Sequence, residues 1–288
     1  MKGRVLEWLH AKNGGSLAGM DPSHFDASAV QETLRWAQMF FGPKKYFGLE
    51  VRGMENIPNA PTMLVSNHSG GTSIPDVWGW MVLWYERFST DRPLHPLAHD
   101  IILSTPGVGT FFERRGVLRA HGPVALRALE AGHDILVMPG GDLDTWRPYK
   151  ERYVVRFGER MGYVRTALRA GVPLVPIANA GAHETLYVLT DGRRFAKKLG
   201  LPAFARSEVF PVSLALPWGV AIGPLPHIPV PARFRYRVGE AIDIPMKLDP
   251  GEEPKRSLVE ELDAAVRGSI QRMLDELRDE SELRKTAQ

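Results

Sequence analysis

Residues 64–76 read LVSNHSGGTSIPD, and the predicted fold is built outward from this stretch. It continues a short apolar run, residues 63–66, of the kind that forms a buried strand. Two glycines follow, and then a Pro-Asp pair that is typical of a helix start. The sequence therefore predicts a strand, a tight turn and a helix, with His68 on the turn and Asp76 at the start of the helix.

This arrangement suits a general base. A histidine on a strand-to-helix turn is held by rigid elements and can still face an open cleft. A nearby carboxylate can fix its tautomer and stabilise its protonated form. Two plainer interpretations stay open. A lone histidine is usually structural, and Ser73 to Asp76 also fits a capping box, in which Asp76 serves only the helix N-terminus.

The composition limits the classes of site. The chain has 288 residues, of which 44% are hydrophobic and 24% are charged, as in ordinary globular proteins. It has no cysteine, so disulfides, a thiolate nucleophile and cysteine-based metal sites are excluded. We expect no secretory signal and no transmembrane helix, because no sustained apolar stretch of sufficient length is present.

The charge is unevenly spread along the chain. Residues 143–200 carry eleven Lys and Arg against five Asp and Glu, whereas residues 251–288 carry seven against ten. The basic middle suits an anionic substrate, a phospholipid surface or nucleic acid, although a scattered solvated surface would look the same. We predict no nucleic-acid partner, because no aromatic or helical recognition module accompanies the charge.

The remaining pattern alternates short apolar strands with helices. It predicts an α/β fold with a largely parallel central sheet covered by helices on both faces, an N-terminal amphipathic helix and a long C-terminal helix. We expect an N-terminal arm and amphipathic helix in 1–45, the α/β domain in 46–245, and a C-terminal helix packed on the same domain in 246–288. The predicted strands are 46–52, 63–66, 93–97, 134–138, 172–178 and 234–238, and the predicted helices are 28–41, 74–87, 124–130, 161–170 and 257–278.

Two apolar segments have an open interpretation. The N-terminal helix, with a capping box at Ser28, carries Trp36 beside its main apolar stripe. It either packs on the domain or lies in a membrane interface with Lys44 and Lys45 near the phosphates. Residues 209–231 hold eight prolines and glycines, so we predict a hydrophobic loop that covers the core or faces lipid.

Two further groups of residues are candidate ligand sites. Arg114 and Arg115 follow a glycine-rich turn, and a guanidinium offers a planar fork to phosphate or carboxylate; a surface salt bridge is the alternative. Gly140, Gly141 and Asp142 end an apolar strand, where α/β sheets usually bind ligands. No serine-hydrolase elbow, P-loop or dinucleotide fingerprint is present, and no metal site is predicted.

The sequence holds several blocks in order: NHSGG to Asp76, GTFFERRG at 109–116, VMPGGD at 137–142, the stretch from Phe157 to Ala170, and VPLVPI at 172–177. Taken together, these blocks resemble the glycerolipid (lysophospholipid) acyltransferase family. The resemblance covers about residues 45–245. It is closest to the branch that holds monoacylglycerol and diacylglycerol acyltransferases. Seven residues lie between His68 and Asp76, more than the family usually has, and we expect Gly70 and Gly71 to absorb the extra length.

The resemblance implies an acyltransferase that moves a fatty acyl group from an acyl thioester to a hydroxyl of a glycerolipid or related acceptor. His68 would be the general base and Asp76 its partner. Backbone amides near Gly70 and Gly71, or near Gly140 and Gly141, would stabilise the oxyanion. Arg114 or Arg115 would hold a phosphate. The enzyme would need no metal or other cofactor.

The implied co-substrate is acyl-CoA or acyl carrier protein. The implied location is cytoplasmic, peripheral on the inner face of a membrane, with the lipid surface as a partner. Two alternatives stay open, a non-catalytic lipid-binding or lipid-transfer module and a lipid or thioester hydrolase. The sequence does not identify the acceptor, the acyl chain length or the oligomeric state.

Overall fold

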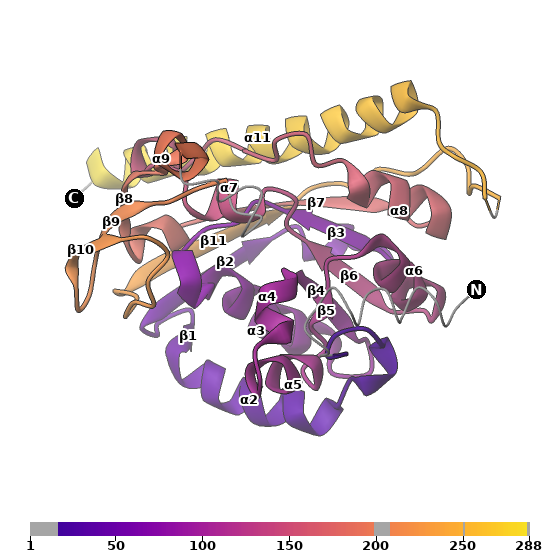
Figure 1. Cartoon of the computed structure of the whole chain (residues 1–288), viewed down its shortest axis with the longest axis horizontal. Helices are drawn as coiled ribbons and strands as arrows, with labels where there is room; N and C mark the ends of the chain where they lie inside the picture. Colours follow the sequence, from indigo (N-terminus) through magenta and orange to yellow (C-terminus); the bar gives the residue numbers. More distant parts are fainter. Residues whose placement is uncertain (1–16, 199–207, 250, 287–288) are drawn as a thin grey trace.

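The computed structural model describes residues 17–198, 208–249 and 251–286, apart from the side chain at position 285. Its centre is an eight-stranded sheet in the order β1-β2-β11-β7-β3-β6-β4-β5 (Figure 1). All neighbouring strands are parallel except β11 and β7. The strands are β1 Phe41–Gly42, β2 Phe47–Arg52, β3 Met63–Ser66, β4 Leu94–Ala98, β5 Leu118–Arg119, β6 Asp134–Val137, β7 Leu174–Ala180 and β11 Ala232–Val238.

Helices cover both faces of this sheet. One face packs against α2 and α3, and the other against α6, α8 and the long α11, which runs across the top of Figure 1. The predicted α/β class, the largely parallel sheet and the long C-terminal helix are confirmed. The helices are α2 Ala27–Phe40, α3 Pro75–Phe88, α4 Asp100–Ser104, α5 Val108–Glu113, α6 Gly122–Glu130, α7 Gly141–Thr145, α8 Gly162–Ala170, α9 Arg193–Lys198 and α11 Arg256–Thr286.

Strand β3 shows why the central strands read as continuous apolar runs. Met63 and Val65 pack against the cluster that contains α6, α8 and α11, whereas Leu64 packs into the cluster with α2 and α3. Alternate side chains of a strand point to opposite faces, and both faces are covered here. The strand pairs with β6 and β7 in the middle of the sheet, so the turn that follows it is held on both sides.

Helix α2 begins earlier than predicted. Its N-cap is Asp26, whose carboxylate accepts the backbone N–H groups of Ser28 and Ala29, so the capping box at Ser28 was wrong. The cap therefore lies two residues before the predicted one, and its carboxylate accepts the first N–H groups of the helix that have no partner within it. The helix buries Val30 in the core while Trp36 stays 64% exposed, so it packs on the domain and still presents apolar side chains to solvent.

The prediction of a loop over residues 209–231 was wrong for residues 212–222. Residues 212–222 form a hairpin, β9 Val212–Ala215 and β10 Gly219–Ile222, which continues a small antiparallel sheet with β8 Tyr187–Thr190. The prolines did not prevent this, because Pro211 and Pro217 lie outside the two strands and leave their hydrogen bonds intact.

The other differences between the predicted and the observed secondary structure are two short helices and the length of α11. The segments expected as turns around 107–116 and 139–142 contain α5 and α7, and glycine punctuation hid them. Helix α11 runs to Thr286, beyond the predicted end at 278, and buries its apolar stripe in the same cluster as α6 and α8. Within the described ranges, no helix is both long and apolar enough to cross a membrane.

Candidate active site

The turn between β3 and α3 carries both predicted catalytic side chains. Gly70 and Gly71 have φ angles of 96° and 66°, and a short 3-10 turn, η3 Gly71–Ser73, follows them. Such positive φ values are easily reached only by glycine. A methyl group at Gly70 would lie 2.5 Å from the ring of Pro75, so the backbone folds closely onto the helix start. This compact turn takes up the seven residues between His68 and Asp76.

The turn brings the two side chains together. The Nδ1 atom of His68 lies 2.7 Å from Oδ2 of Asp76, whose carboxylate is fully buried, and 15% of the His68 side chain is exposed. An ionised carboxylate only accepts hydrogen bonds, so Nδ1 carries the proton and donates it. The other ring nitrogen, Nε2, then holds the lone pair, and no partner for it is found among the described residues. This is the tautomer that a general base needs.

Asp76 is fixed by several backbone contacts. Its Oδ2 atom also accepts the N–H of Ser69 at 2.7 Å, and Oδ1 accepts the N–H of Val77 at 2.9 Å. The hydroxyl of Tyr236 donates to the backbone carbonyl of Asp76 at 2.8 Å. Asp76 therefore serves the helix start and His68 at once. Ser73 does not cap the helix as the predicted box required, because its hydroxyl donates to the carbonyl of His227.

The environment of His68 changes its basicity in opposing ways. Burial lowers the pKa of His68, but the charge and hydrogen bond of Asp76, with the charge of Asp144, raise it by more. The net pKa of His68 lies above the ordinary histidine value of about 6.5. In the folded protein, the stabilisation from protonated His68 is therefore complete below that value and is lost as the pH rises through the raised pKa.

This balance predicts a pH profile. Because only the neutral imidazole accepts a proton, the acid limb of kcat/KM for acyl transfer should lie above pH ~6.5. In Asp76→Asn the limb should move to lower pH and the rate should fall by about 10²- to 10⁴-fold, since the tautomer is no longer fixed. A pH–rate profile of both proteins measures this. A limb that stays in place in Asp76→Asn would show that Asp76 does not control the base.

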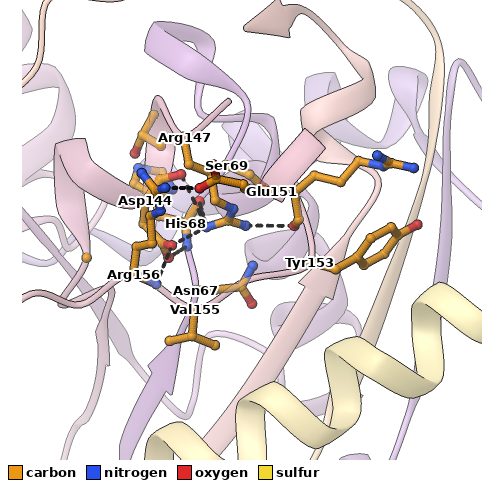
Figure 2. A network of polar contacts seen from close by, with 12 residues as sticks. Asn67, His68, Ser69, Asp144, Arg147, Glu151, Tyr153, Val155 and Arg156 are labelled. Atoms are coloured by element: carbon orange, nitrogen blue, oxygen red, sulfur yellow. Dashed lines mark hydrogen bonds and ion pairs between the residues drawn. The ribbon is translucent and has the colours of Figure 1, made fainter. Parts of the chain in front are cut away.

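A buried ion pair anchors the backbone of His68 (Figure 2). Asp144 and Arg147 have fully buried side chains and contact each other. Asp144 Oδ2 accepts the N–H of His68 at 2.7 Å, and Arg147 donates to the carbonyl of His68 at 3.3 Å. Sequence reasoning missed both residues. The available signal was a second acidic residue two positions after Asp142, followed three positions later by an arginine.

Two asparagines tie the same turn to β7. The Asn67 side chain donates to the carbonyl of Asn179 at 2.9 Å and accepts its backbone N–H at 2.8 Å. The Asn179 side chain donates back to the carbonyl of Asn67 at 2.6 Å, and Ser69 donates to the Asn179 side-chain oxygen at 3.0 Å. All three residues are buried, so these bonds extend the sheet pairing beyond the last residue of β3 and hold His68 in place.

The predicted group at 140–142 lies beside this network but has other partners. Asp142 pairs with Arg160 at 2.8 Å and accepts the backbone N–H of Glu208 at 2.7 Å. Gly140 has no room for a side chain, because a methyl group there would meet the Cβ of Asp144 at 2.4 Å. Thus Asp144, and not Asp142, is the carboxylate of this segment that reaches the catalytic turn.

The candidate oxyanion donors fall into two groups. Within residues 17–198, 208–249 and 251–286, no acceptor is found for the backbone N–H groups of Gly70 and Gly71. No acceptor is found in these ranges for the N–H of Gly140 either, whereas the N–H of Gly141 is occupied, because it donates to the carbonyl of Met138 at 3.0 Å. The turn after β3 therefore has N–H groups available for a developing anion, and Gly141 does not.

The two predicted arginines contact the N-terminal helix. Arg114 pairs with Asp26 at 2.6 Å, and Arg115 donates to the hydroxyl of Thr33 at 2.5 Å and to the carbonyl of Phe111 at 2.9 Å. Among the described contacts, neither reaches the network around His68.

The turn geometry predicts a sharp difference between two glycine variants. Gly70→Ala should lower the stability by about 1–3 kcal/mol and reduce activity, because a strained φ angle is combined with the clash on Pro75. Gly132 is the matched control, since its φ of 87° is similar and nothing lies within 4 Å of an added methyl group. Thermal unfolding and initial rates test this. Equal losses in the two variants would contradict a special role for the turn at Gly70.

Other titratable groups near the turn stay neutral or paired. Burial and the nearby charge of Arg147 hold the pKa of His183 well below the ordinary histidine value, so it is a neutral side chain. Burial also lowers the pKa of His227, whose ring packs against Gly71. In the described part of the chain, no group of three or more His, Cys, Asp or Glu residues is placed to hold a metal ion.

The segment that holds this site matches a known protein family. Residues 48–180 match the sequence model of the family described as Acyltransferase. That segment of the chain belongs to the acyltransferase family. The match runs from β2 to the end of β7, so it contains the His68–Asp76 turn and the Asp144–Arg147 pair.

The chain is also similar to parts of several individual proteins. It is 33% identical to an uncharacterized protein of Mycobacterium tuberculosis over 226 residues, which are 78% of this chain and 58% of that protein. It is 28% identical to the "DGAT1/2-independent enzyme synthesizing storage lipids" of Gallus gallus, over 80% of this chain and 60% of that enzyme. The human enzyme of the same name is 26% identical over 64% of this chain and 56% of its own length. The chain thus spans less than two thirds of these relatives.

Among solved structures, the chain resembles the 1-acyl-sn-glycerophosphate (LPA) acyltransferase PlsC from Thermotoga maritima. The TM-score is 0.48 with 17% sequence identity, over 88% of this chain and 78% of that one. The assignment of residues 48–180 to the acyltransferase family rests on the match to the family model and not on this similarity.

Proposed function

We propose that the chain transfers a fatty acyl group from an acyl thioester to a hydroxyl of a glycerolipid or related lipid. The single observation that carries this proposal is the 2.7 Å contact between His68 Nδ1 and Asp76, which leaves Nε2 without a partner among the described residues; 15% of the His68 side chain is exposed. Membership of the acyltransferase family supports the reaction class.

In the proposed step, His68 Nε2 takes the proton of the acceptor hydroxyl. The oxygen then attacks the thioester carbonyl, and a tetrahedral intermediate with a negative oxygen forms. When the C–S bond breaks, the thiolate leaves and takes the proton from the imidazolium, which yields an ester and a free thiol. Asp76 stabilises the imidazolium between the two transfers.

The backbone N–H groups of Gly70 and Gly71 are the proposed oxyanion donors. They are held by a turn that is bonded at both ends, so they need little rearrangement as charge develops on the oxygen. The step uses a histidine, a carboxylate and backbone N–H groups, and we therefore propose no metal or other cofactor.

The proposed donor is acyl-CoA or acyl carrier protein, both of which carry phosphate. Arg114 and Arg115 remain our proposed phosphate ligands; Arg114 is 58% exposed and can exchange Asp26 for a phosphate. The proposed acceptor is a glycerolipid. The chicken and human relatives are named as enzymes synthesizing storage lipids, and on this basis we propose an uncharged acceptor.

We propose a location on the cytoplasmic face of a membrane, where such acceptors reside. Exposed apolar side chains such as Trp36, 64% exposed, and Ile101, 64% exposed, support a peripheral association.

An acceptor screen tests the proposed function. Labelled acyl-CoA is incubated with monoacylglycerol, diacylglycerol, lysophospholipids and no acceptor, and the lipid products are separated. The proposal predicts a labelled ester with at least one acceptor. Label in free fatty acid with every acceptor would identify a hydrolase, and stoichiometric lipid binding without thiol release would identify a binding module; either result contradicts the proposal.

A further inference from the structure

The small sheet of β8, β9 and β10 presents an apolar surface to solvent. Cross-strand pairing sets Val220 opposite Leu214, and Leu214 opposite Tyr187, so the three side chains form one row. Their exposed fractions are 60%, 45% and 45%. Ile222 lies two positions after Val220 on β10 and points the same way. Leu189 lies at a register shift in β8, and Leu216 directly follows β9. We call this surface the outer face; it consists of Tyr187, Leu189, Leu214, Leu216, Val220 and Ile222, all of which are exposed.

The opposite face of the same sheet is already used. Val188, Ser213 and Ala221 are paired across the strands and buried. Val188 packs into a cluster with Leu143 and Trp146, next to the Asp144–Arg147 pair. The sheet therefore buries one face against the protein. Its outer face is apolar where an ordinary solvent-facing strand would be polar.

The outer face is directly connected to the catalytic turn. Leu216, which directly follows β9, pairs with Ile228 in an isolated bridge and so joins the hairpin to residues 223–231. This segment contacts the turn after β3, because Thr72 donates to the carbonyl of Leu225 at 3.0 Å and Ser73 donates to the carbonyl of His227 at 2.9 Å. Residues 223–231 thus contact both the end of the hairpin and the catalytic turn.

The charge beside the outer face is basic. Helix α9 carries Arg193, Arg194, Lys197 and Lys198, and all four are exposed. Figure 1 shows α9 with β8, β9 and β10 at one end of the molecule. The helix is joined to the sheet region by a ring contact of 5.4 Å between Phe195 and Phe210.

Two acidic residues next to α9 are paired. Asp191 pairs with Arg156 at 3.1 Å, and Glu208 pairs with Arg160 at 3.1 Å and with Arg193 at 3.6 Å. These pairs leave the surface of α9 basic.

We propose that the outer face docks on an anionic lipid bilayer. The aliphatic row enters the headgroup–acyl boundary, the α9 cations meet lipid phosphates, and Trp218 at the hairpin tip, 53% exposed, sits at the interface. A second copy of the chain fits less well, because the basic helices would repel one another. This inference rests on the proposed function in one respect, because it takes the lipid of the bilayer to supply the acyl acceptor.

Vesicle binding tests this docking. The full chain is mixed with vesicles of phosphatidylcholine and phosphatidylglycerol, or of phosphatidylcholine alone, and the bound fraction is measured by sedimentation. Val220→Asp should lower the partition coefficient for the anionic vesicles by about tenfold or more. Leu283→Asp on α11 is the matched control, since Leu283 is 71% exposed and lies on another element. It should bind as the wild type does.

Three results would overturn the docking proposal. In the first, Val220→Asp binds the anionic vesicles normally. In the second, Trp36→Asp on α2 loses binding while Val220→Asp keeps it, which would assign docking to the N-terminal helix. In the third, sedimentation velocity shows that wild type self-associates and that Val220→Asp only dissociates it.

The docking test is independent of catalysis. His68→Ala should bind vesicles like wild type, and Val220→Asp should keep full activity on a short-chain thioester with a water-soluble acceptor. If no acyl transfer is ever found, the proposed function fails while vesicle binding still decides the docking.

Discussion

His68→Ala is expected to lower the rate of acyl transfer by about 10²- to 10⁴-fold, the usual contribution of a general base. The variant keeps the turn, because the backbone of residue 68 is held by Asp144 and Arg147 and not by the imidazole. Asp76 keeps two backbone N–H partners. The loss should therefore appear in the rate of thiol release while circular dichroism stays unchanged.

A second histidine–aspartate pair gives the control for this variant. His121 lies 2.9 Å from Asp100 and its side chain is 25% exposed, so His121→Ala removes a similar contact at a different place. It should cost little activity. If His68→Ala keeps full activity, or if His121→Ala loses as much, His68 is not the base.

Arg147→Met should lower the free energy of unfolding by about 3–5 kcal/mol, since it leaves the buried carboxylate of Asp144 without its counter-charge. Asp144 also holds the backbone N–H groups of His68, at 2.7 Å, and Arg156, at 3.1 Å. Acyl transfer should therefore fall in the molecules that remain folded. Denaturant unfolding and initial rates measure the two effects.

Arg160→Met is the matched comparison for Arg147→Met. Arg160 pairs with Asp142, two positions before Asp144. This pair is less buried, because the side chain of Arg160 is 36% exposed and that of Asp142 is 22% exposed. Water stabilises the partner left behind, so the loss should be about 1 kcal/mol or less. A loss as large as that of Arg147→Met would mean that burial does not set the cost of breaking these pairs.

The sequence predicted those parts of the fold whose signal is local. The apolar run at 63–66 and the glycine pair gave the strand and turn, and Pro75 gave the helix start within one residue. The alternation of such units predicted the parallel sheet. The hairpin at 212–222 was missed because its composition is rich in proline and glycine, although the prolines flank its strands.

The supporting residues of the site were harder to predict, because their roles depend on direction in space. Asp142 and Asp144 lie two positions apart on a short helix, so they point to different sides, and only the structure shows that Asp144 meets His68. Asn179 lies 112 positions from Asn67 and is brought to it by strand pairing. Arg114 and Arg115 had the right chemistry for phosphate, but the sequence held no sign that helix α2 would pair with them.

The most direct measurement of the central claim is the balance between thiol release and ester formation. Wild type is incubated with a labelled acyl thioester, with and without a lipid acceptor, and both products are counted in the same reaction. Thiol release should depend on the acceptor, and each thiol released should be matched by one labelled ester. Both products should fall together in His68→Ala. Thiol release that ignores the acceptor, with the label in free fatty acid, would contradict the claim.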